Sequence, residues 1–384
     1  MSSSIKVAPF TRRLNSLSGI QNAILALALS FIFSRLVIVG VAYTGYTLFH
    51  VVPTDASLSH LIKEMWSRWD VGWYRLIAFE GYEQGSFSAE SYKKWGFLPL
   101  YPFLVKAVLW LFNTNKFFWV GSILSSLLTF SALLILSNSF KDRIQNASRF
   151  FLLYLISAGS FHLSLPYSES LALFFLACTF YFTKKKNYFL AALLAGLGAV
   201  TRIQMLALLV IPFIPVFLDF EKKISRNIFN SFVVLVLFSI PTLIHMGYLN
   251  YLSGNPFAYF DMQEAWGNKN PYPLESLVVF LSKGLQNAPR DWLHFFIWAT
   301  FGACLIRNYK KIPLNEIVFC TIIFLISTGC EIFYGANRYV LLLIPLYITL
   351  TNEDEWFRNL YIYSNLVIGC LYIIAFTNDK ILAL

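Results

Sequence analysis

The chain has 384 residues, of which 57% are hydrophobic and only 13% are charged, and its formal net charge is +10. A soluble domain carries about 25% charged residues, so the composition excludes an ordinary soluble protein. The lysines and arginines gather in short segments between apolar runs, a pattern that orientation in a membrane explains, and nucleic-acid binding is not expected.

The hydrophobic residues form long runs, which predict an all-α polytopic membrane protein with about 11 transmembrane helices. Only helices and closed barrels satisfy backbone polar groups in lipid, and these runs are longer than the roughly 10-residue strands of a barrel. No linker, low-complexity tract or repeat interrupts the pattern, so residues 1–384 are expected to form a single transmembrane domain. The predicted spans are roughly 19–43, 117–138, 150–165, 168–183, 188–200, 203–219, 228–250, 292–306, 314–332, 338–350 and 359–377.

The first run follows a polar stretch, residues 1–18, that contains Lys6, Arg12 and Arg13. The run is too long for a signal peptide and lacks a clear small-residue cleavage site. We therefore expect an uncleaved first helix with its N-terminus in the cytoplasm. Arg35 inside this run is expected either to pair with a carboxylate or to extend towards the headgroups.

The segment 97–112, FLPLYPFLVKAVLWLF, decides the topology. If it spans the membrane, four later basic groups face outward. If it lies along the outer surface, all four are cytoplasmic, as the positive-inside rule favours, so we predict an interfacial helix. The external loops are then 44–116 and 251–290. The four basic groups are Lys141/Arg143/Arg149, Lys184–Lys186, Lys222/Lys223/Arg226 and Arg307/Lys310/Lys311.

The stretch SRWDVGWYRLIAFEGY, residues 67–82, places Asp70 between Trp69 and Trp73 in the first external loop. Asp70 is a candidate general base whose pKa burial would raise, or else the N-cap of the helix that follows it. The aromatic residues are either an interfacial belt or a platform on which a sugar ring packs.

Three further charged residues interrupt apolar runs on the predicted outer side. Glu169, in SLPYSES, either caps the next helix or holds acceptor hydroxyls and acts as a second acid or base. Arg202, in GAVTRIQM, and Arg338, in GANRYVLL, either bind a phosphate group or extend to lipid headgroups.

The remaining chemistry-bearing residues give no cofactor motif. The five cysteines lie in or beside apolar segments without metal-binding spacing, and the histidines form no HxH or HExxH pattern. Neither a DxD motif nor a glycine-rich phosphate loop is found. We expect no metal and no cofactor.

Several stretches, in order from about residue 67 to residue 345, together resemble the PIG-V type mannosyltransferases of GPI-anchor synthesis and their bacterial relatives. RWDVGWYRLIAFEGY followed by FLPLYPFLVKAV is similar to the first external loop of that family, and LPYSESLALFF to its Y-[ST]-E-S turn. GAVTRIQM resembles its T-R element, GNPFAYFDMQEAWG its G-[DN]-P-x-A-[FY]-x-x-x-Q-x-x-W loop, and GANRYVLLLIP its R-Y-x-x-x-x-x-P element.

The resemblance implies a GT-C glycosyltransferase fold with interfacial helices in the first external loop. It implies a polyprenyl-phosphate sugar donor, used outside the cytoplasm, with mannose as the sugar. Asp70 matches the proposed base of the family, and Glu169 matches its turn glutamate. The residues expected to bind substrate are Arg68, Trp69, Trp73, Tyr74, Arg202, Gln263, Trp266, Arg338 and Tyr339.

We therefore expect a single displacement with inversion, in which Asp70 deprotonates an acceptor hydroxyl and the lipid phosphate leaves. The charge on the phosphate would be stabilised by Arg202, Arg338 or a lysine such as Lys93 or Lys94. The acceptor is expected to be a lipid-linked or cell-envelope glycan at a bacterial plasma membrane, with the endoplasmic reticulum as the alternative. A lipid or glycan transporter or flippase, and a polymer ligase or acyltransferase, are the competing classes of protein.

Overall fold

The structure, a computed structural model, describes residues 8–50, 57–86, 93–219, 221, 223–265, 272, 274–329 and 335–378, and of residues 8–20 only the backbone. Every secondary-structure element in these ranges is a helix. The α-helices are α1 (Ala8–Phe49), α2 (Leu58–Trp66), α3 (Asp70–Glu80), α4 (Leu100–Leu111), α5 (Phe117–Ser139), α6 (Ala147–Leu155), α7 (Glu169–Lys184), α8 (Tyr188–Ala199), α9 (Val210–Phe217), α10 (Ile224–Ser253), α11 (Ala258–Ala265), α12 (Glu275–Lys283), α13 (Pro289–Asn308), α14 (Leu314–Ser327), α15 (Ala336–Tyr339), α16 (Ile344–Leu350) and α17 (Glu355–Thr377). The 3₁₀ helices are η1 (Lys94–Gly96), η2 (Ser160–Ser164), η3 (Ile203–Leu209), η4 (Gly284–Gln286), η5 (Tyr309–Lys311) and η6 (Val340–Leu342).

Four helices in the described part of the chain are long and apolar enough to cross a membrane, which indicates an integral membrane protein. Several of the other predicted spans are shorter or broken. The segment 150–165 contains most of α6 and all of η2, and the segment 338–350 contains the end of α15 together with η6 and α16. A count of about 11 spans stays a prediction. The four long segments are Gln21–Phe49, Phe117–Ser139, Ile224–Ser253 and Glu355–Thr377.

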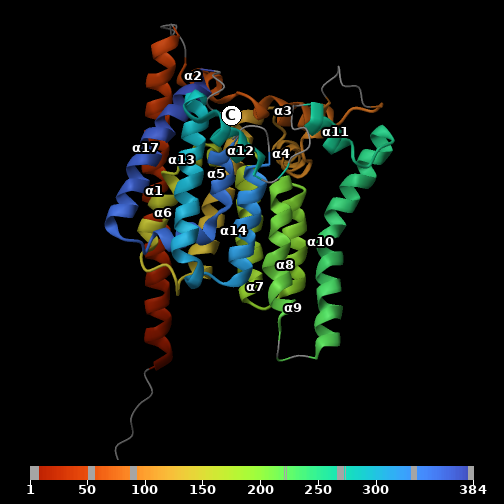
Figure 1. Cartoon of the computed structure of the whole chain (residues 1–384). Helices are drawn as coiled ribbons and strands as arrows, with labels where there is room; N and C mark the ends of the chain where they lie inside the picture. The colour runs from red at the N-terminus through yellow and green to blue at the C-terminus, as the bar shows by residue number, and fades with distance from the viewer. Residues whose placement is uncertain are drawn as a thin grey trace, which may run out of the picture.

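Short helices gather at one end of the bundle, which we call the α3 end. Figure 1 shows α2, α3, α4 and α11 at this end. The first predicted external loop, 44–116, is thus mostly helical. Helix α4 has 12 residues, fewer than the roughly 20 that a span needs, so its length agrees with the predicted interfacial helix.

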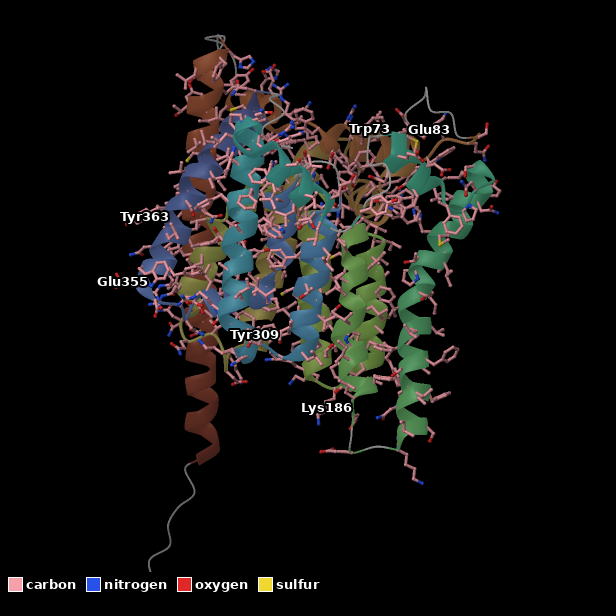
Figure 2. All side chains as sticks on the ribbon, in the orientation of Figure 1. Trp73, Glu83, Lys186, Tyr309, Glu355 and Tyr363 are labelled. Atoms are coloured by element: carbon pink, nitrogen blue, oxygen red, sulfur yellow. The ribbon has the colours of Figure 1, made fainter. Side chains whose placement is uncertain are left out.

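The opposite end of the bundle carries the basic connections. Figure 2 places Lys186 at this end and Trp73 at the α3 end. Arg143 pairs with Glu316 at 2.7 Å, and Lys184 Nζ donates to the Ser139 carbonyl oxygen at 2.6 Å. These contacts join the end of α5 to the end of α7 and the start of α14. They agree with the prediction that the basic groups after α5 and α7 lie on the same side of the protein.

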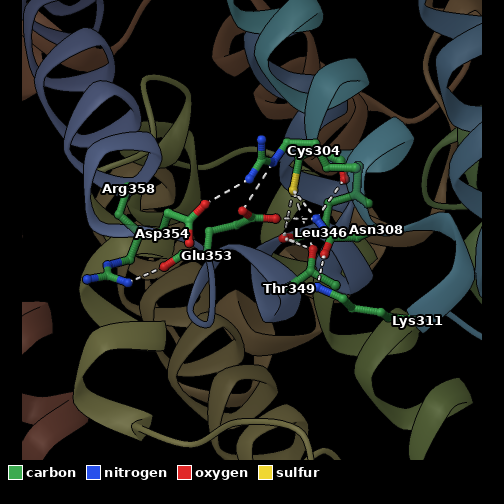
Figure 3. A network of polar contacts seen from close by, with 9 residues as sticks. Cys304, Asn308, Lys311, Leu346, Thr349, Glu353, Asp354 and Arg358 are labelled. Carbon is green, nitrogen blue, oxygen red and sulfur yellow. Dashed lines mark hydrogen bonds and ion pairs between the residues drawn. The ribbon is translucent and has the colours of Figure 1, made fainter.

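A polar network at the opposite end ties α13 to the segment between α16 and α17 (Figure 3). Arg307 Nε lies 3.3 Å from Glu353 Oε2, and Arg307 Nη2 lies 3.0 Å from Asp354 Oδ2. Asn308 donates to the same glutamate, and Arg358 donates to its backbone carbonyl oxygen. These contacts hold the start of α17 against α13.

Arg35 lies in the first long helix and has no carboxylate partner in the part of the chain that the structure describes. Its Nη1 donates to the Ser160 carbonyl oxygen at 2.8 Å and to Ser164 Oγ at 3.0 Å. The expectation of a paired carboxylate is therefore wrong for this residue. The contact instead fixes η2 beside α1, immediately before the turn that contains Glu169.

Candidate active site at the α3 end

Asp70 is the first residue of α3 and not its N-cap. The N-cap position belongs to Trp69, whose side chain makes no capping hydrogen bond. Trp69 has φ +54°, a backbone conformation that residues other than glycine rarely adopt and that costs about 1–3 kcal/mol. The predicted N-cap alternative for Asp70 is therefore wrong, and its carboxylate is directed to a partner outside α3.

That partner is Arg338, which bridges two carboxylates. Arg338 Nη2 lies 2.8 Å from Asp70 Oδ2, and Arg338 Nε donates to Glu169 Oε1. Arg202 Nη1 lies 2.6 Å from the same Glu169 oxygen. The prediction that these four residues lie on one side of the protein is confirmed by their direct contacts. Their chemical roles stay predictions.

The two carboxylates differ in exposure. The side chain of Glu169 is 2% exposed and that of Asp70 is 22% exposed. Burial by itself would raise the pKa of Glu169, but the charges of Arg202 and Arg338 outweigh that effect and lower its pKa to about 2. Asp70 is thus the carboxylate that a substrate can reach, whereas the contacts of Glu169 favour holding the two arginines.

Two hydrogen bonds fix α3 against the turn that precedes Glu169. The hydroxyl of Tyr74 donates to Ser168 Oγ at 2.9 Å, and the hydroxyl of Tyr167 donates to the carbonyl oxygen of Arg68 at 3.2 Å. The guanidinium of Arg338 also lies over the Tyr167 ring, 5.1 Å from its centre. These contacts position the backbone on both sides of Asp70.

A close backbone approach places the turn that carries Arg338. Gly159 packs directly against the Asn337 carbonyl, so a Cβ added at this glycine would overlap that carbonyl oxygen. Asn337 is fully buried. Only glycine therefore allows the segment before η2 to approach the residue that precedes Arg338.

A cavity of about 430 Å³ adjoins the charged cluster. Of the predicted site residues, eight line it, whereas Arg68 and Glu169 do not. Trp266 lies outside the described residues. The eight are Trp69, Asp70, Trp73, Tyr74, Arg202, Gln263, Arg338 and Tyr339.

The cavity also contains residues that the sequence did not single out. Gln204 Nε2 donates to the hydroxyl of Tyr339 at 3.0 Å, and Tyr259 lines the wall beside Gln263. Trp73 stacks on Phe97 with ring centres 5.5 Å apart. Gln204 stands two residues after Arg202 in GAVTRIQM, and Phe97 opens the stretch FLPLYPFLVKAV, so both residues lie in motifs that the sequence had already marked.

Lys94 is not placed to stabilise a leaving phosphate. Its Nζ lies 2.6 Å from Glu80 and 3.6 Å from Glu83, and the side chain is 8% exposed. The residue does not line the cavity. The expectation for Lys94 is therefore wrong, because two carboxylates already neutralise it. Within the described ranges, no group of three or more His, Cys, Asp or Glu side chains is arranged to hold a metal ion.

A scan against protein-family models and a search of curated proteins each gave no match. Two solved structures are similar to this chain. The archaeal oligosaccharyltransferase AglB from Archaeoglobus fulgidus, in complex with an inhibitory peptide and a dolichol-phosphate, matches with a TM-score of 0.47 and 11% identity over 89% of this chain and 56% of that chain. An Archaeoglobus fulgidus oligosaccharyltransferase tethered to an acceptor peptide matches with a TM-score of 0.44 and 12% identity over 90% and 55%. The chain spans just over half the length of these two proteins.

Proposed function

We propose that this protein is a membrane glycosyltransferase of the GT-C type. It transfers a sugar from a polyprenyl-phosphate donor to a hydroxyl of a lipid-linked or cell-envelope acceptor. One observation carries the proposal: the Asp70 carboxylate and the guanidinium groups of Arg202 and Arg338 line one cavity of about 430 Å³. Ligand pockets are typically about 300–1,000 Å³, so the volume fits a sugar phosphate. Mannose as the sugar, and a bacterial plasma membrane as the location, rest on the sequence resemblance.

The cavity presents the groups that such a donor needs. Two guanidinium groups match the oxygens of a phosphate with charge-assisted hydrogen bonds. Trp69 and Trp73 line the same cavity and offer apolar ring faces for a sugar. The cavity lies at the α3 end of a bundle with four membrane-length helices, where the prenyl chain of a donor can remain in lipid.

The reaction is a single displacement with inversion. The acceptor oxygen forms a bond to the anomeric carbon, and the bond between that carbon and the phosphate oxygen breaks. The hydroxyl proton passes to Asp70, and both electrons of the broken bond leave with the prenyl phosphate. Arg202 and Arg338 stabilise the negative charge that develops on the leaving group.

Donor binding prepares Asp70 for this role. In the structure the carboxylate accepts a hydrogen bond from Arg338 Nη2 at 2.8 Å, which occupies one of its oxygens. A donor phosphate in the cavity competes for that guanidinium. When Arg338 turns to the phosphate, Asp70 loses this hydrogen bond, and its oxygen is free to accept one from the acceptor hydroxyl. Glu169 remains bound to Arg202 throughout and keeps the arginines in place.

The test is sugar transfer by the full-length protein in membranes, with radiolabelled polyprenyl-phosphate mannose and endogenous lipid acceptors. Asp70→Asn should lower transfer by about 10²–10⁴-fold, the usual contribution of a general base. Asp142→Asn, the same substitution at an exposed aspartate between α5 and α6, should leave transfer unchanged at equal protein levels.

Equal transfer by the wild type and by Asp70→Asn would remove Asp70 as the base. If the wild type transfers nothing from polyprenyl-phosphate mannose, the same assay with other polyprenyl-phosphate sugars decides the matter. Activity with one of them replaces mannose in the proposal, and inactivity with all of them overturns the reaction class.

A further inference from the structure

A second and larger cavity, of about 830 Å³, lies against the other face of α3. Val71, Gly72 and Arg75 line this second cavity, whereas Asp70, Trp73 and Tyr74 line the first. The first turns of α3 thus form a wall between the two. We call the second cavity the basic cleft. Its lining residues are Ser59, Lys63, Ser67, Val71, Gly72, Arg75, Asn115, Lys116, Phe117, Phe118 and Trp119.

The basic cleft carries three positive charges and, among its described lining residues, no carboxylate. Lys63, Arg75 and Lys116 are all exposed, and none has an acidic partner within 4 Å in the described part of the chain. The guanidinium carbon of Arg75 lies over the ring of Phe79, 5.6 Å from the ring centre. Lys94, by contrast, contacts two glutamates. The positive charge of the cleft is therefore available to an anionic ligand.

The position of the cleft favours a lipid as the source of that anion. Phe117, Phe118 and Trp119 line it and form the first turn of α5, one of the membrane-length helices. Asn115 also lines the adjacent groove, which includes Trp110, an indole that is 83% exposed. Cationic side chains beside exposed aromatic residues match the interface where phosphate headgroups lie.

We propose that the basic cleft binds the phosphate head of a membrane lipid, and that this lipid is the acceptor of the transfer reaction. The second clause rests on the proposed function. An α-helix with its side chains is about 10 Å wide, so a phosphate in the cleft lies about 10 Å from Asp70. A short glycan can span this distance. A lipid held there by its phosphate can extend its glycan over the N-terminal end of α3, with a hydroxyl at the carboxylate.

The first test measures binding alone, by native mass spectrometry of the purified full-length protein in detergent with short-chain phosphatidic acid. The variant carries Lys63→Gln, Arg75→Gln and Lys116→Gln. Three cations at a membrane surface together contribute on the order of 100-fold in affinity, and the variant should lose that amount. The control changes three exposed lysines elsewhere to glutamine and should bind as the wild type does: Lys141, Lys223 and Lys283.

Equal phosphatidic acid binding by the wild type and the cleft variant overturns the proposal. Inorganic phosphate that binds as tightly as phosphatidic acid overturns the lipid as the source and leaves a free-phosphate site. If the triple variant does not fold, Lys116→Gln alone should weaken phosphatidic acid binding about fivefold.

The second test separates the two proposals. In the transfer assay the cleft variant should raise the KM for the acceptor without changing the KM for the donor. If the wild type transfers no sugar from any polyprenyl-phosphate donor while the cleft variant still loses phosphatidic acid, the proposed function fails and the lipid site stands. If Asp70→Asn abolishes transfer and the cleft variant keeps the acceptor KM of the wild type, the acceptor does not use the cleft.

Discussion

Glu169→Gln tests whether one buried carboxylate holds the charged cluster together. Glu169 takes part in two of the three ion pairs among Asp70, Glu169, Arg202 and Arg338, and it is the least exposed of the four. Glutamine keeps the size of the side chain and removes its charge. The perturbation therefore acts on the electrostatics of the cluster and leaves its packing in place.

The expected magnitude follows from the charge balance. The two carboxylates and two guanidinium groups of the cluster sum to zero. Glu169→Gln leaves one positive charge without a counter-charge in a largely buried site, and removing one partner of a buried pair costs about 3–5 kcal/mol. With an unfolding entropy of about 2.1 cal/mol/K per residue, that cost lowers the Tm of this chain by roughly 4–6 °C.

Thermal unfolding of the purified protein in detergent, followed by tryptophan fluorescence, measures this shift. Glu64→Gln is the control, because this glutamate is 47% exposed, and its Tm should stay within about 1 °C of the wild type. Adding Arg202→Gln to Glu169→Gln restores neutrality and should recover part of the loss. A Glu169→Gln protein that unfolds at the wild-type temperature would refute the reasoning, since the arginines would then not depend on this carboxylate.

Two further predictions concern the same cluster. The stability that Glu169 contributes should be fully present above pH 4.5, its ordinary pKa, and be lost as the pH falls towards about 2; the Tm difference between the wild type and Glu169→Gln, measured across that range, should therefore shrink on acidification. Gly159→Ala should displace the turn that carries Arg338 and lower sugar transfer by roughly 10²-fold, whereas Gly302→Ala, where an added Cβ meets nothing within 4 Å, should transfer as the wild type does. Equal transfer by the two alanine variants would show that the position of the turn does not matter.

The sequence was sufficient to predict which residues share one end of the molecule. The positive-inside rule assigns the basic groups to one side, and the alternation of apolar runs then gathers Asp70, Glu169, Arg202 and Arg338 on the other. The structure brings these four into direct contact. This prediction succeeds because assigning each connecting segment to a side of the membrane requires only the order of the apolar runs. It does not require their packing.

The pairing inside the cluster could not be predicted in the same way. The Arg338 contact to Asp70 joins residues 268 positions apart, and its contact to Glu169 joins residues 169 apart. Such distances are bridged by tertiary packing, which a linear pattern does not contain. The unusual backbone of Trp69, which makes Asp70 the first residue of α3 and not its cap, has no sequence signal either.

The lengths of the helices also could not be predicted from the pattern of apolar residues. An apolar run shows only that a segment is buried in lipid or in protein, and it does not show whether the helix is continuous. The run 338–350 contains Pro345 in the first turn of α16, where proline's missing N–H ends the preceding helical hydrogen bonding. In 150–165 the helix stops at Leu155, and η2 begins only after Gly159, which meets the Asn337 carbonyl.

The neutrality of the cluster bears on the order in which substrates bind, if Asp70 is the base. A neutral set of four ionisable groups can lie at the end of an apolar bundle because each charge has a partner, but the same pairing occupies the carboxylate that must accept a proton. A donor phosphate brings the additional negative charge that can take Arg338 from Asp70. An acceptor hydroxyl brings no charge and cannot do so. The acceptor would therefore find a competent base only after the donor has bound, which makes the binding of the donor the step that activates the site.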